Sequence, residues 1–355
     1  AGAPSAEDYI GFSTASSDVL NPNLGNQTRT VRGIIFSSGT AGFHLTSGTF
    51  ELDRGGINNY DTNVQTFDTA FRLTEGQYWD GGNGGLIVNG DVDNPGHLLI
   101  VQGAATSELN GRLTGAGGLA KDGSGILLVT GSNTYTGPTF VHQGTFVANN
   151  SDGSATGSGD LLVEAGTVAG YGRIEGDAFF SSGSRLTAGA ISSGTTPLLD
   201  LALQQQNRLT FGGDVHLDGD FAFYLAALSE TVGFTQITLD GADADLILGL
   251  NSRFVLEAGS FLGVDDPNSG NAFWDIEHQW VLADLTGSGE INNLFANVDL
   301  GNWLQGGFTL LTDGGTGNDL VLHYTPVPEP ASWLLLAAGA AFVLRLRRTA
   351  RPRDD

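Results

Sequence analysis

The residues with the chemistry to bind a metal ion in this chain are carboxylates set among glycines and asparagines. Residues 314–322 fit one copy of the calcium nonapeptide G-G-x-G-x-D-x-U-x. Residues 266–277 have oxygen-bearing side chains at the first, third and twelfth positions of an EF-hand type of loop, but Asn271 replaces the glycine at the sixth. Ordinary turns are the simpler interpretation of both segments. The calcium candidates are Asp319, Asp266, Asn268 and Glu277, and no other cofactor is expected.

The chain offers little of the chemistry that enzymes use. It has no cysteine, and therefore neither a thiol nucleophile nor a disulfide. Its six histidines lie 45 or more residues apart, and neither HExxH nor GxSxG occurs. Polygalacturonase-like enzymes need several carboxylates acting as acid and base, but Asn133-Thr134 lacks the aspartate that would complete their motif. The sequence therefore favours a protein that is not an enzyme, with a polysaccharide lyase or hydrolase as an alternative.

The charge balance is strongly acidic. Fifteen basic residues face 39 acidic ones, which gives a net charge of −24, and Lys121 is the single lysine. Five arginines lie in the last eleven residues, so the rest of the chain is poorer still in positive charge. Because binding to phosphate requires clustered Lys and Arg, this composition excludes nucleic acid as a partner.

Short runs of alternating apolar residues, bounded by Gly, Asn, Asp, Ser and Thr, predict β-strands throughout residues 29–325. No stretch before residue 330 keeps helical periodicity for more than about two turns. The protein is therefore expected to be all-β. The residues predicted to point into its core are Ile34, Leu86, Val88, Leu127, Val129, Leu161 and Val163.

The repeated turn phrases favour a solenoid over a sandwich. Gly144, Gly166 and Gly183 each lie in a tight turn before a strand, at intervals of 22 and 17 residues, which is a plausible length for one coil. At roughly 20–25 residues per coil, the chain has room for about a dozen coils. A long β-sandwich explains the strands nearly as well.

The C-terminal segment combines three features in a fixed order. A Pro-Glu-Pro element comes first, followed by an apolar run that predicts a helix over residues 331–346, about 24 Å long at roughly 1.5 Å per residue. These 16 residues are slightly fewer than the ~20 that a helix needs to span a bilayer. The proposed sorting residues are Val327, Pro328, Glu329 and Pro330; the membrane segment includes Ala331, Trp333, Leu344 and Leu346; the basic tail is Arg345, Arg347, Arg348, Arg351 and Arg353.

This order resembles the PEP-CTERM sorting signal of Gram-negative bacteria. The resemblance implies that a membrane exosortase recognises the tail and processes it, which releases the protein to the cell surface or the extracellular matrix. The precursor would be anchored in the inner membrane through the helix. An ordinary tail anchor is the alternative. The small residues Ala1-Gly2-Ala3 and the absence of methionine lead us to expect that a signal peptide has been removed.

A second resemblance covers the middle of the chain. The run GGLAKDGSGILLVTGSNTYTG at residues 117–137, with Gly144-Thr145, is similar to the autotransporter-associated β-strand repeat. Members of that family form right-handed parallel β-helices in exported passenger proteins. The resemblance therefore implies a right-handed parallel β-helix followed by a short hydrophobic helix. No translocating β-barrel is expected after Tyr324, so the PEP-CTERM tail would replace that export route.

These observations predict four parts: an N-terminal segment or cap (1–28), a β-solenoid with the repeat at its core (29–200, core 115–150), a β-rich continuation or cap (201–325) and the sorting signal (326–355). The predicted function is that of an exported structural or adhesin-like protein of the cell surface or biofilm matrix. Its expected partners are an exosortase, the membrane before processing, and exopolysaccharide.

A carbohydrate-binding β-helix module is the alternative function. It predicts a row of exposed aromatic side chains along one side of the stack. Trp79, Tyr135 and Tyr171 are the aromatic residues that we expect in such a row.

Overall fold

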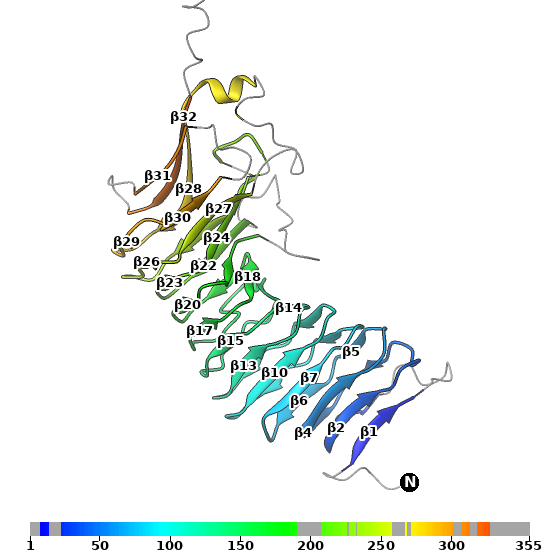
Figure 1. The fold of residues 1–355 in the computed structure, drawn as a ribbon. Coiled ribbons are helices and arrows are strands. Elements are labelled where there is room, and N and C mark those ends of the chain that lie inside the picture. The colour runs from blue at the N-terminus through cyan, green and yellow to red at the C-terminus, as the bar shows by residue number, and fades with distance from the viewer. Residues whose placement is uncertain are drawn as a thin grey trace, which may run out of the picture.

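The computed structural model describes residues 8–13, 23–189, 207–225, 227–231, 233–257, 267, 271–300, 307–312 and 318–326. The chain winds into an elongated stack of coils whose strands form three faces (Figure 1). All pairings between the described strands are parallel except those of the last hairpin. The predicted all-β parallel solenoid is confirmed, and the face-packed antiparallel sandwich is wrong.

Each face is a ladder of strands from successive coils. The first face contains β1 (Tyr9–Phe12), the second halves of β2 (Thr28–Phe36) and β4 (Thr49–Asn59), β7 (Gln77–Asp80), β10 (Leu98–Gln102), β13 (Gly118–Lys121), β15 (Thr139–Val141), β17 (Leu161–Val163), β20 (Ala178–Phe180), β23 (Val215–Leu217), β26 (Leu246–Leu248) and β29 (Ile291–Asn292). The second face contains β3 (His44–Leu45), β5 (Gln65–Phe67), β8 (Leu86–Val88), β11 (Ser107–Leu109), β14 (Ile126–Val129), β16 (Thr145–Ala148), β18 (Thr167–Gly170), β21 (Arg185–Leu186), β24 (Asp220–Tyr224), β27 (Arg253–Glu257) and β30 (Asn297–Asp299). The third face contains the first halves of β2 and β4, β6 (Ala70–Leu73), β9 (Val92–Asp93), β12 (Leu113–Thr114), β19 (Arg173–Ile174), β22 (Arg208–Phe211), β25 (Gln236–Leu239), β28 (His278–Leu285), β32 (Leu320–Thr325) and β31 (Gly307–Thr312).

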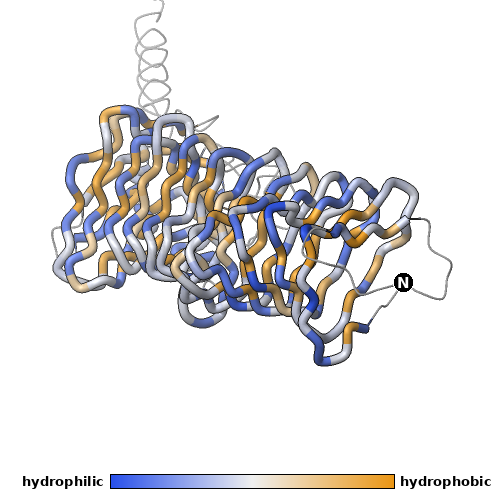
Figure 2. Tube along the Cα trace, turned by 90° about the horizontal axis from the view of Figure 1, so that it is seen from below, coloured by the Kyte–Doolittle hydropathy of each residue, from blue (hydrophilic) through white to orange (hydrophobic). Residues whose placement is uncertain are grey.

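The core lies inside the three faces. Since side chains alternate along a strand, every second residue points inward and stacks on its equivalent in the next coil. Apolar segments of successive coils therefore lie over one another (Figure 2). The seven residues predicted to point inward, from Ile34 to Val163, are all buried, which confirms that part of the prediction.

Coil length changes along the stack. Hydrogen bonds between equivalent positions join residues 22 apart at Gln102 and Asp80 and 20 apart at Thr130 and Asn110, within the predicted range. After residue 189 the spacing widens to 37 residues between Asp177 and Asp214, and to 45 between Asp245 and Glu290. The prediction of 20–25 residues per coil is therefore wrong for the later coils, in which more residues separate strands that remain paired.

The third face has no strand between β12 and β19, and the stack changes direction in this region (Figure 1). Isolated backbone hydrogen bonds still join the coils there, such as that from the Asn133 N–H to the Ser154 carbonyl (2.8 Å), and side chains add to them. Asn133 accepts a hydrogen bond from the Leu113 N–H (2.7 Å) and donates one to the Ala155 carbonyl (2.7 Å), so one amide joins three coils. The Ser154 hydroxyl accepts from the Glu175 N–H in the next coil (3.2 Å).

An antiparallel hairpin and an aromatic cluster close the C-terminal end of the third face. Strand β32 pairs with β28 on one side and with β31 on the other. A short 3-10 helix, η3 (Ala272–Asp275), brings Trp274 against Tyr324 with ring centroids 4.9 Å apart. Because this hairpin runs antiparallel, it ends the repeat of parallel coils.

Pro326 follows β32 directly, and the sorting residues Val327 to Pro330, the helix predicted over residues 331–346 and the basic tail lie outside the described residues. Within the part of the chain that the structure describes, there is no helix of the length and apolar character needed to cross a membrane.

Candidate interaction surface

The calcium candidates are placed separately or lie outside the described residues. The Asp319 carboxylate accepts a hydrogen bond from the Leu285 N–H (3.0 Å) and so joins β32 to the end of β28. Glu277 is exposed, and its carboxylate lies 3.9 Å from His323 Nε2. Asp266 and Asn268 are not among the described residues. Among those that are, no three His, Cys, Asp or Glu side chains come together as a metal site.

Several histidines pair with a carboxylate in an adjacent coil. His44 Nε2 lies 2.6 Å from Asp68 Oδ2, and His142 Nδ1 lies 3.2 Å from Asp122 Oδ1. The hydrogen bonds from Asn89 and His44 hold the pKa of Asp68 below its usual value, although burial opposes them. Both pairs link neighbouring coils, so they stabilise the stack.

Lys121 is buried and bridges two turns. Its Nζ donates to the carbonyls of Asp122 (2.6 Å) and Gly123 (2.7 Å) in its own coil, and to that of Gln143 (3.3 Å) in the next. Burial lowers the pKa of Lys121 to about 8, while the charge of Asp122 partly offsets the effect. The lysine in the repeat motif thus connects two coils.

The aromatic residues predicted to form a binding row do not do so. Trp79 and Tyr135 are buried in the core, where the Trp79 indole donates to Gln77 Oε1 and the Tyr135 hydroxyl bonds to Thr139. Tyr171 is partly exposed. The prediction was wrong for Trp79 because its strand places even-numbered residues outward, which exposes the neighbouring Tyr78.

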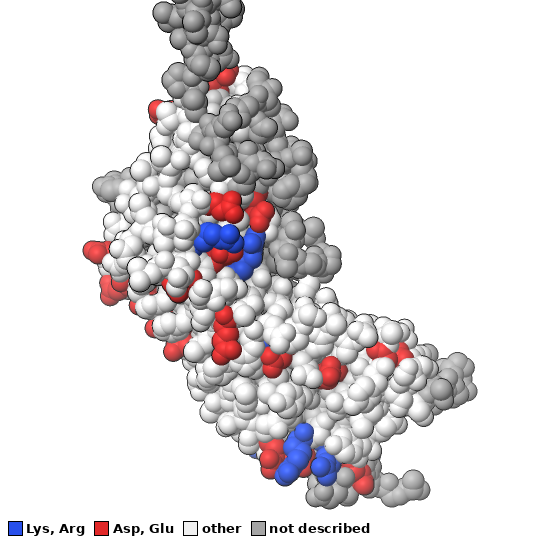
Figure 3. Space-filling model, in the orientation of Figure 1, with Lys and Arg blue, Asp and Glu red and all other residues white. Residues whose placement is uncertain are grey.

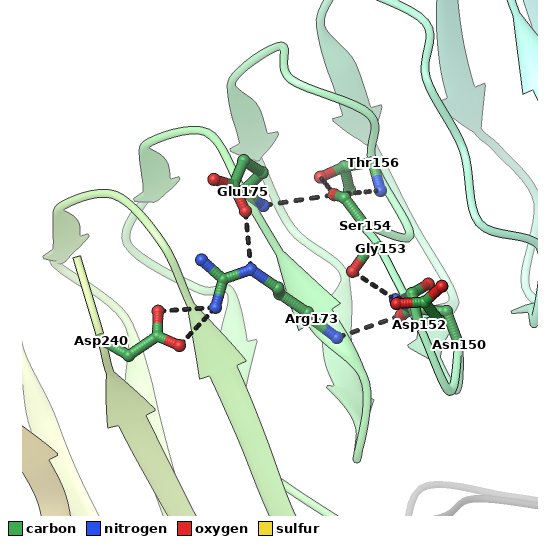
Figure 4. Close-up of polar contacts among 8 residues, drawn as sticks. All are labelled: Asn150, Asp152, Gly153, Ser154, Thr156, Arg173, Glu175 and Asp240. Carbon is green, nitrogen blue, oxygen red and sulfur yellow. Dashed lines mark hydrogen bonds and ion pairs between the residues drawn. The ribbon is translucent and has the colours of Figure 1, made fainter.

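A network of ion pairs centred on Arg173 lies on the third face (Figure 4). Its Nε donates to Glu175 (2.6 Å), and its Nη1 donates to both carboxylate oxygens of Asp240 (2.6 and 2.5 Å). Burial alone would lower the pKa of Arg173, but the hydrogen bonds and charges of Asp240 and Glu175 raise it. This guanidinium is engaged by protein carboxylates and links residues 67 positions apart in the chain.

Other arginines also join coils. Their ion pairs are Arg54–Glu75 (3.7 Å), Arg72–Asp93 (3.6 Å), Arg185–Glu257 (2.7 Å), Arg208–Asp284 (3.4 Å) and Arg253–Asp220 (2.6 Å). Figure 3 shows a small basic group bordered by acidic side chains in the upper half of the molecule, with further acidic side chains on the same side. Since the carboxylates outnumber the basic groups, they dominate the surface charge.

The first face carries a column of mostly apolar side chains on its outer side, here called the outer stripe, in which Ala120 is buried and the other members are partly or largely exposed. Register places its members one above another in eight successive coils. They are Tyr78, Ile100, Ala120, Phe140, Leu162, Phe179, His216 and Ile247. Tyr78 is 52% exposed and Phe179 is 36% exposed. The rings of Phe179 and His216 stack, with centroids 4.6 Å apart and planes 16° apart.

A row of carboxylates runs beside the downstream half of the outer stripe, two residues before it on each strand. This acidic row consists of Asp160, Asp177, Asp214, Asp245 and Glu290. Asp177 and Asp214 each accept a hydrogen bond from the backbone N–H at the same position one coil further (2.9 Å in both cases), and Asp245 does the same (2.7 Å). Because successive coils are about 4.8 Å apart, negative charges are stacked closely along this edge.

Hydrogen-bonding side chains run along the other edge of the outer stripe. This polar row consists of Asp80, Gln102, Asp122, His142, Glu164, Ser181 and Asp218. Gln102 donates to Asp80 (2.9 Å). The hydrogen bonds that Asn251 donates lower the pKa of Asp218. The first face therefore presents an apolar centre between two polar edges. The sequence did not predict this arrangement: a spacing of two marks the members within one strand, but not which strands stack on one another.

Comparison with known proteins identifies two segments. Residues 119–148, from β13 to β16, match the passenger-associated-transport-repeat, and residues 326–348 match the PEP-CTERM protein-sorting motif. Over 130 residues, 36% of this chain, the sequence is 30% identical to a protein described as the adhesin BmaC autotransporter of Brucella suis biovar 1 (strain 1330). That match spans 4% of the length of the Brucella protein.

Both resemblances seen in the sequence are thus confirmed. The repeat coincides with the coils that Lys121 and Asn133 hold together, and the sorting motif begins immediately after the last strand of the stack. The chain therefore carries a passenger-associated-transport-repeat within its solenoid and a PEP-CTERM protein-sorting motif after it.

Proposed function

We propose that this protein is exported and sorted through its PEP-CTERM motif by an exosortase, and that its solenoid serves as a non-enzymatic structural or adhesin-like body at the cell surface or in the extracellular matrix. The observation that carries the proposal is the sorting motif at residues 326–348, which starts directly after β32. A solenoid followed by a sorting motif is the order that suits a folded body held by a removable anchor.

The similarity to part of an adhesin autotransporter supports the adhesin-like role. A stacked parallel solenoid also suits such a role, because each coil contacts only its neighbours and the body becomes long and stiff. The engagement of Lys121, Asn133 and Arg173 in joining coils supports a non-enzymatic function. We further propose that the coils wind in the right-handed sense, as nearly all parallel strand crossovers do.

In this proposal, residues 331–346 form a helix that anchors the precursor in the inner membrane, and Arg345, Arg347 and Arg348 keep the tail on the cytoplasmic side. The short span and the arginines together would present the motif to the exosortase. The mature protein then joins the surface or the biofilm matrix, where exopolysaccharide is the proposed partner.

Localisation of tail variants tests the proposal. The substitutions E329A and P330A are expected to leave the thermal unfolding of the protein unchanged but to retain it in the inner-membrane fraction. P352A is the matched control, because Pro352 lies outside the matched motif. Neutralising Arg345, Arg347 and Arg348 is expected to mislocalise the protein more than neutralising Arg351 and Arg353, which also lie outside it. Normal surface delivery of E329A and P330A would refute sorting through this motif.

A further inference from the structure

The outer stripe is an apolar column on an otherwise acidic molecule, and its downstream half, from Leu162 to Ile247, lies beyond the buried Ala120. Its members come from eight successive coils, so it runs parallel to the axis of the stack. Phe179 and His216 border a shallow hollow of about 370 Å³ that Ser181, Asp218 and Ile247 also line. Large exposed apolar patches rimmed by polar groups mark interaction sites in soluble proteins.

The edges of the stripe restrict the partner. The acidic row brings Asp160, Asp177, Asp214 and Asp245 along one side, and Glu164 and Asp218 lie along the other. Each bond that Asp177, Asp214 and Asp245 accept from the next coil uses one carboxylate oxygen, Oδ1. These anchored carboxylates attract cations and repel nucleic acid, uronate polymers and anionic membranes. A second copy of the chain, with its own net charge of −24, is repelled as well.

We propose that the downstream half of the outer stripe, from Leu162 to Ile247, binds an extended polysaccharide that carries free amino groups. The apolar faces of its sugar rings would lie on Phe179 and His216. Its ammonium groups would pair with the acidic row, and its hydroxyl groups would donate to Glu164 and Asp218. A chain-like partner fits because chemically equivalent groups recur along the face with each coil, about every 4.8 Å.

This inference deepens the proposed function by naming the partner of the solenoid. It rests on that function only in that the protein would meet the polysaccharide at the cell surface or in the extracellular matrix. Binding is measured with the full purified chain, and sorting is measured in cells. A protein that is sorted normally but binds no glycan would contradict this inference alone, while a protein that binds but is not sorted would contradict only the proposed function.

The first experiment measures binding of chitosan oligosaccharides, their N-acetylated counterparts and oligogalacturonate by titration calorimetry. We expect binding of the chitosan oligosaccharides, at least tenfold weaker binding of the N-acetylated ones, and none of the oligogalacturonate. Equal affinity for the first two, or no affinity for any, would overturn the proposal. Concentration-dependent dimerisation that F179A abolishes would assign the stripe to a second copy and would also overturn it.

The second experiment separates the apolar and the acidic contributions. F179A is expected to weaken chitosan binding by roughly 3- to 10-fold, as loss of one aromatic contact does. Y60A is the control, because Tyr60 is 64% exposed but lies outside the outer stripe. Affinity of F179A equal to that of the unsubstituted protein would exclude the stripe as the site.

The triple variant D177N/D214N/D245N keeps an oxygen to accept each backbone N–H but removes three charges. We expect at least tenfold weaker binding and a smaller dependence of affinity on salt concentration. D91N is the matched control, because Asp91 accepts a hydrogen bond from the Arg112 N–H in the next coil (2.9 Å) at a different corner of the stack. Circular dichroism verifies that the triple variant is folded. Unchanged affinity in a folded triple variant would exclude the acidic row.

Discussion

At the residue scale, single polar side chains add hydrogen bonds between coils to those that the backbone makes. The Lys121 ammonium binds three carbonyls from two coils, and the Asn133 amide bonds to the backbone of two neighbouring coils. Both residues are buried. A buried polar group without a partner costs about 1–3 kcal/mol, so each of these side chains stabilises the stack chiefly by satisfying backbone groups around it.

Replacing Lys121 tests this interpretation. K121M keeps the aliphatic stem but leaves the carbonyls of Asp122, Gly123 and Gln143 without the donor, so the free energy of unfolding should fall by about 1–3 kcal/mol at pH 7. R112M, at an exposed position, is the control and should change it by less than about 0.5 kcal/mol. Urea unfolding followed by circular dichroism measures both. Equal stability of K121M and the unsubstituted protein would contradict a bridging role.

The same variant shows the effect of the lowered pKa. Lys121 has a pKa of about 8 in the folded chain against 10.5 for the free side chain, so the unfolded state binds the proton more tightly between these values. Stability rises with pH where the unfolded state holds more protons. The advantage of the unsubstituted protein over K121M should therefore increase between pH 8 and pH 10.5.

At the element scale, the turns determine how closely coils stack. Gly125 lies against the preceding coil, and a Cβ built on it would come within 2.2 Å of the Ala105 carbonyl oxygen. Gly183 has a φ of +91° but open space around it. Gly96 has open space around it and no positive φ. These three glycines therefore separate the need for close approach from the need for a left-handed backbone.

Alanine substitutions distinguish the two requirements. G125A should destabilise the protein by about 1–3 kcal/mol or more through overpacking, and G183A by about 1–2 kcal/mol through backbone strain. G96A is the control and should have little effect. Thermal unfolding ranks the three variants. If G125A is as stable as G96A, the close stacking of this turn on the preceding coil is not required for folding.

At the scale of the whole molecule, the excess of negative charge opposes folding. The net charge is −24, and the arginines of the described coils are mostly occupied in exposed or half-exposed ion pairs between coils. Such pairs contribute about 0–1 kcal/mol each. We expect repulsion among the remaining carboxylates to outweigh these pairs, because carboxylates stacked in adjacent coils, such as Asp177, Asp214 and Asp245, lie about 4.8 Å apart, well within one Debye length.

Salt should consequently stabilise the protein. Raising NaCl from about 10 mM to 500 mM at pH 7 shortens the Debye length from about 30 Å to less than 8 Å and should increase Tm. The variant D177N/D214N/D245N, which removes three stacked charges, should show a smaller increase. Differential scanning calorimetry measures the change of Tm with salt concentration for both proteins. A Tm that falls with salt would indicate that the ion pairs between coils dominate instead.

The sequence by itself determined the class of fold, the inward residues and both motifs. Alternation with a period of two predicts strands and their buried side, and glycine-bounded turn phrases predict coils, because these are local properties of the chain. The residues predicted to point inward are buried, and residues 119–148 and 326–348 match the families that the sequence suggested. Lys121 and Asn133 were visible within the motif, but their roles depend on partners 20 or more residues away.

Only the tertiary structure decided which side chains share a surface. Tyr78 and Trp79 are adjacent aromatic residues, and a shift of one residue exchanges their environments, so pairing with β4 and β10 had to set the exposed one. The outer stripe and the acidic row depend on the same strand register. That register is kept even where 37 residues separate Asp177 from Asp214 and 45 separate Asp245 from Glu290. Spacing in the sequence cannot reveal such columns, because each member is placed by hydrogen bonds to a neighbouring coil and the number of residues between coils is free to vary.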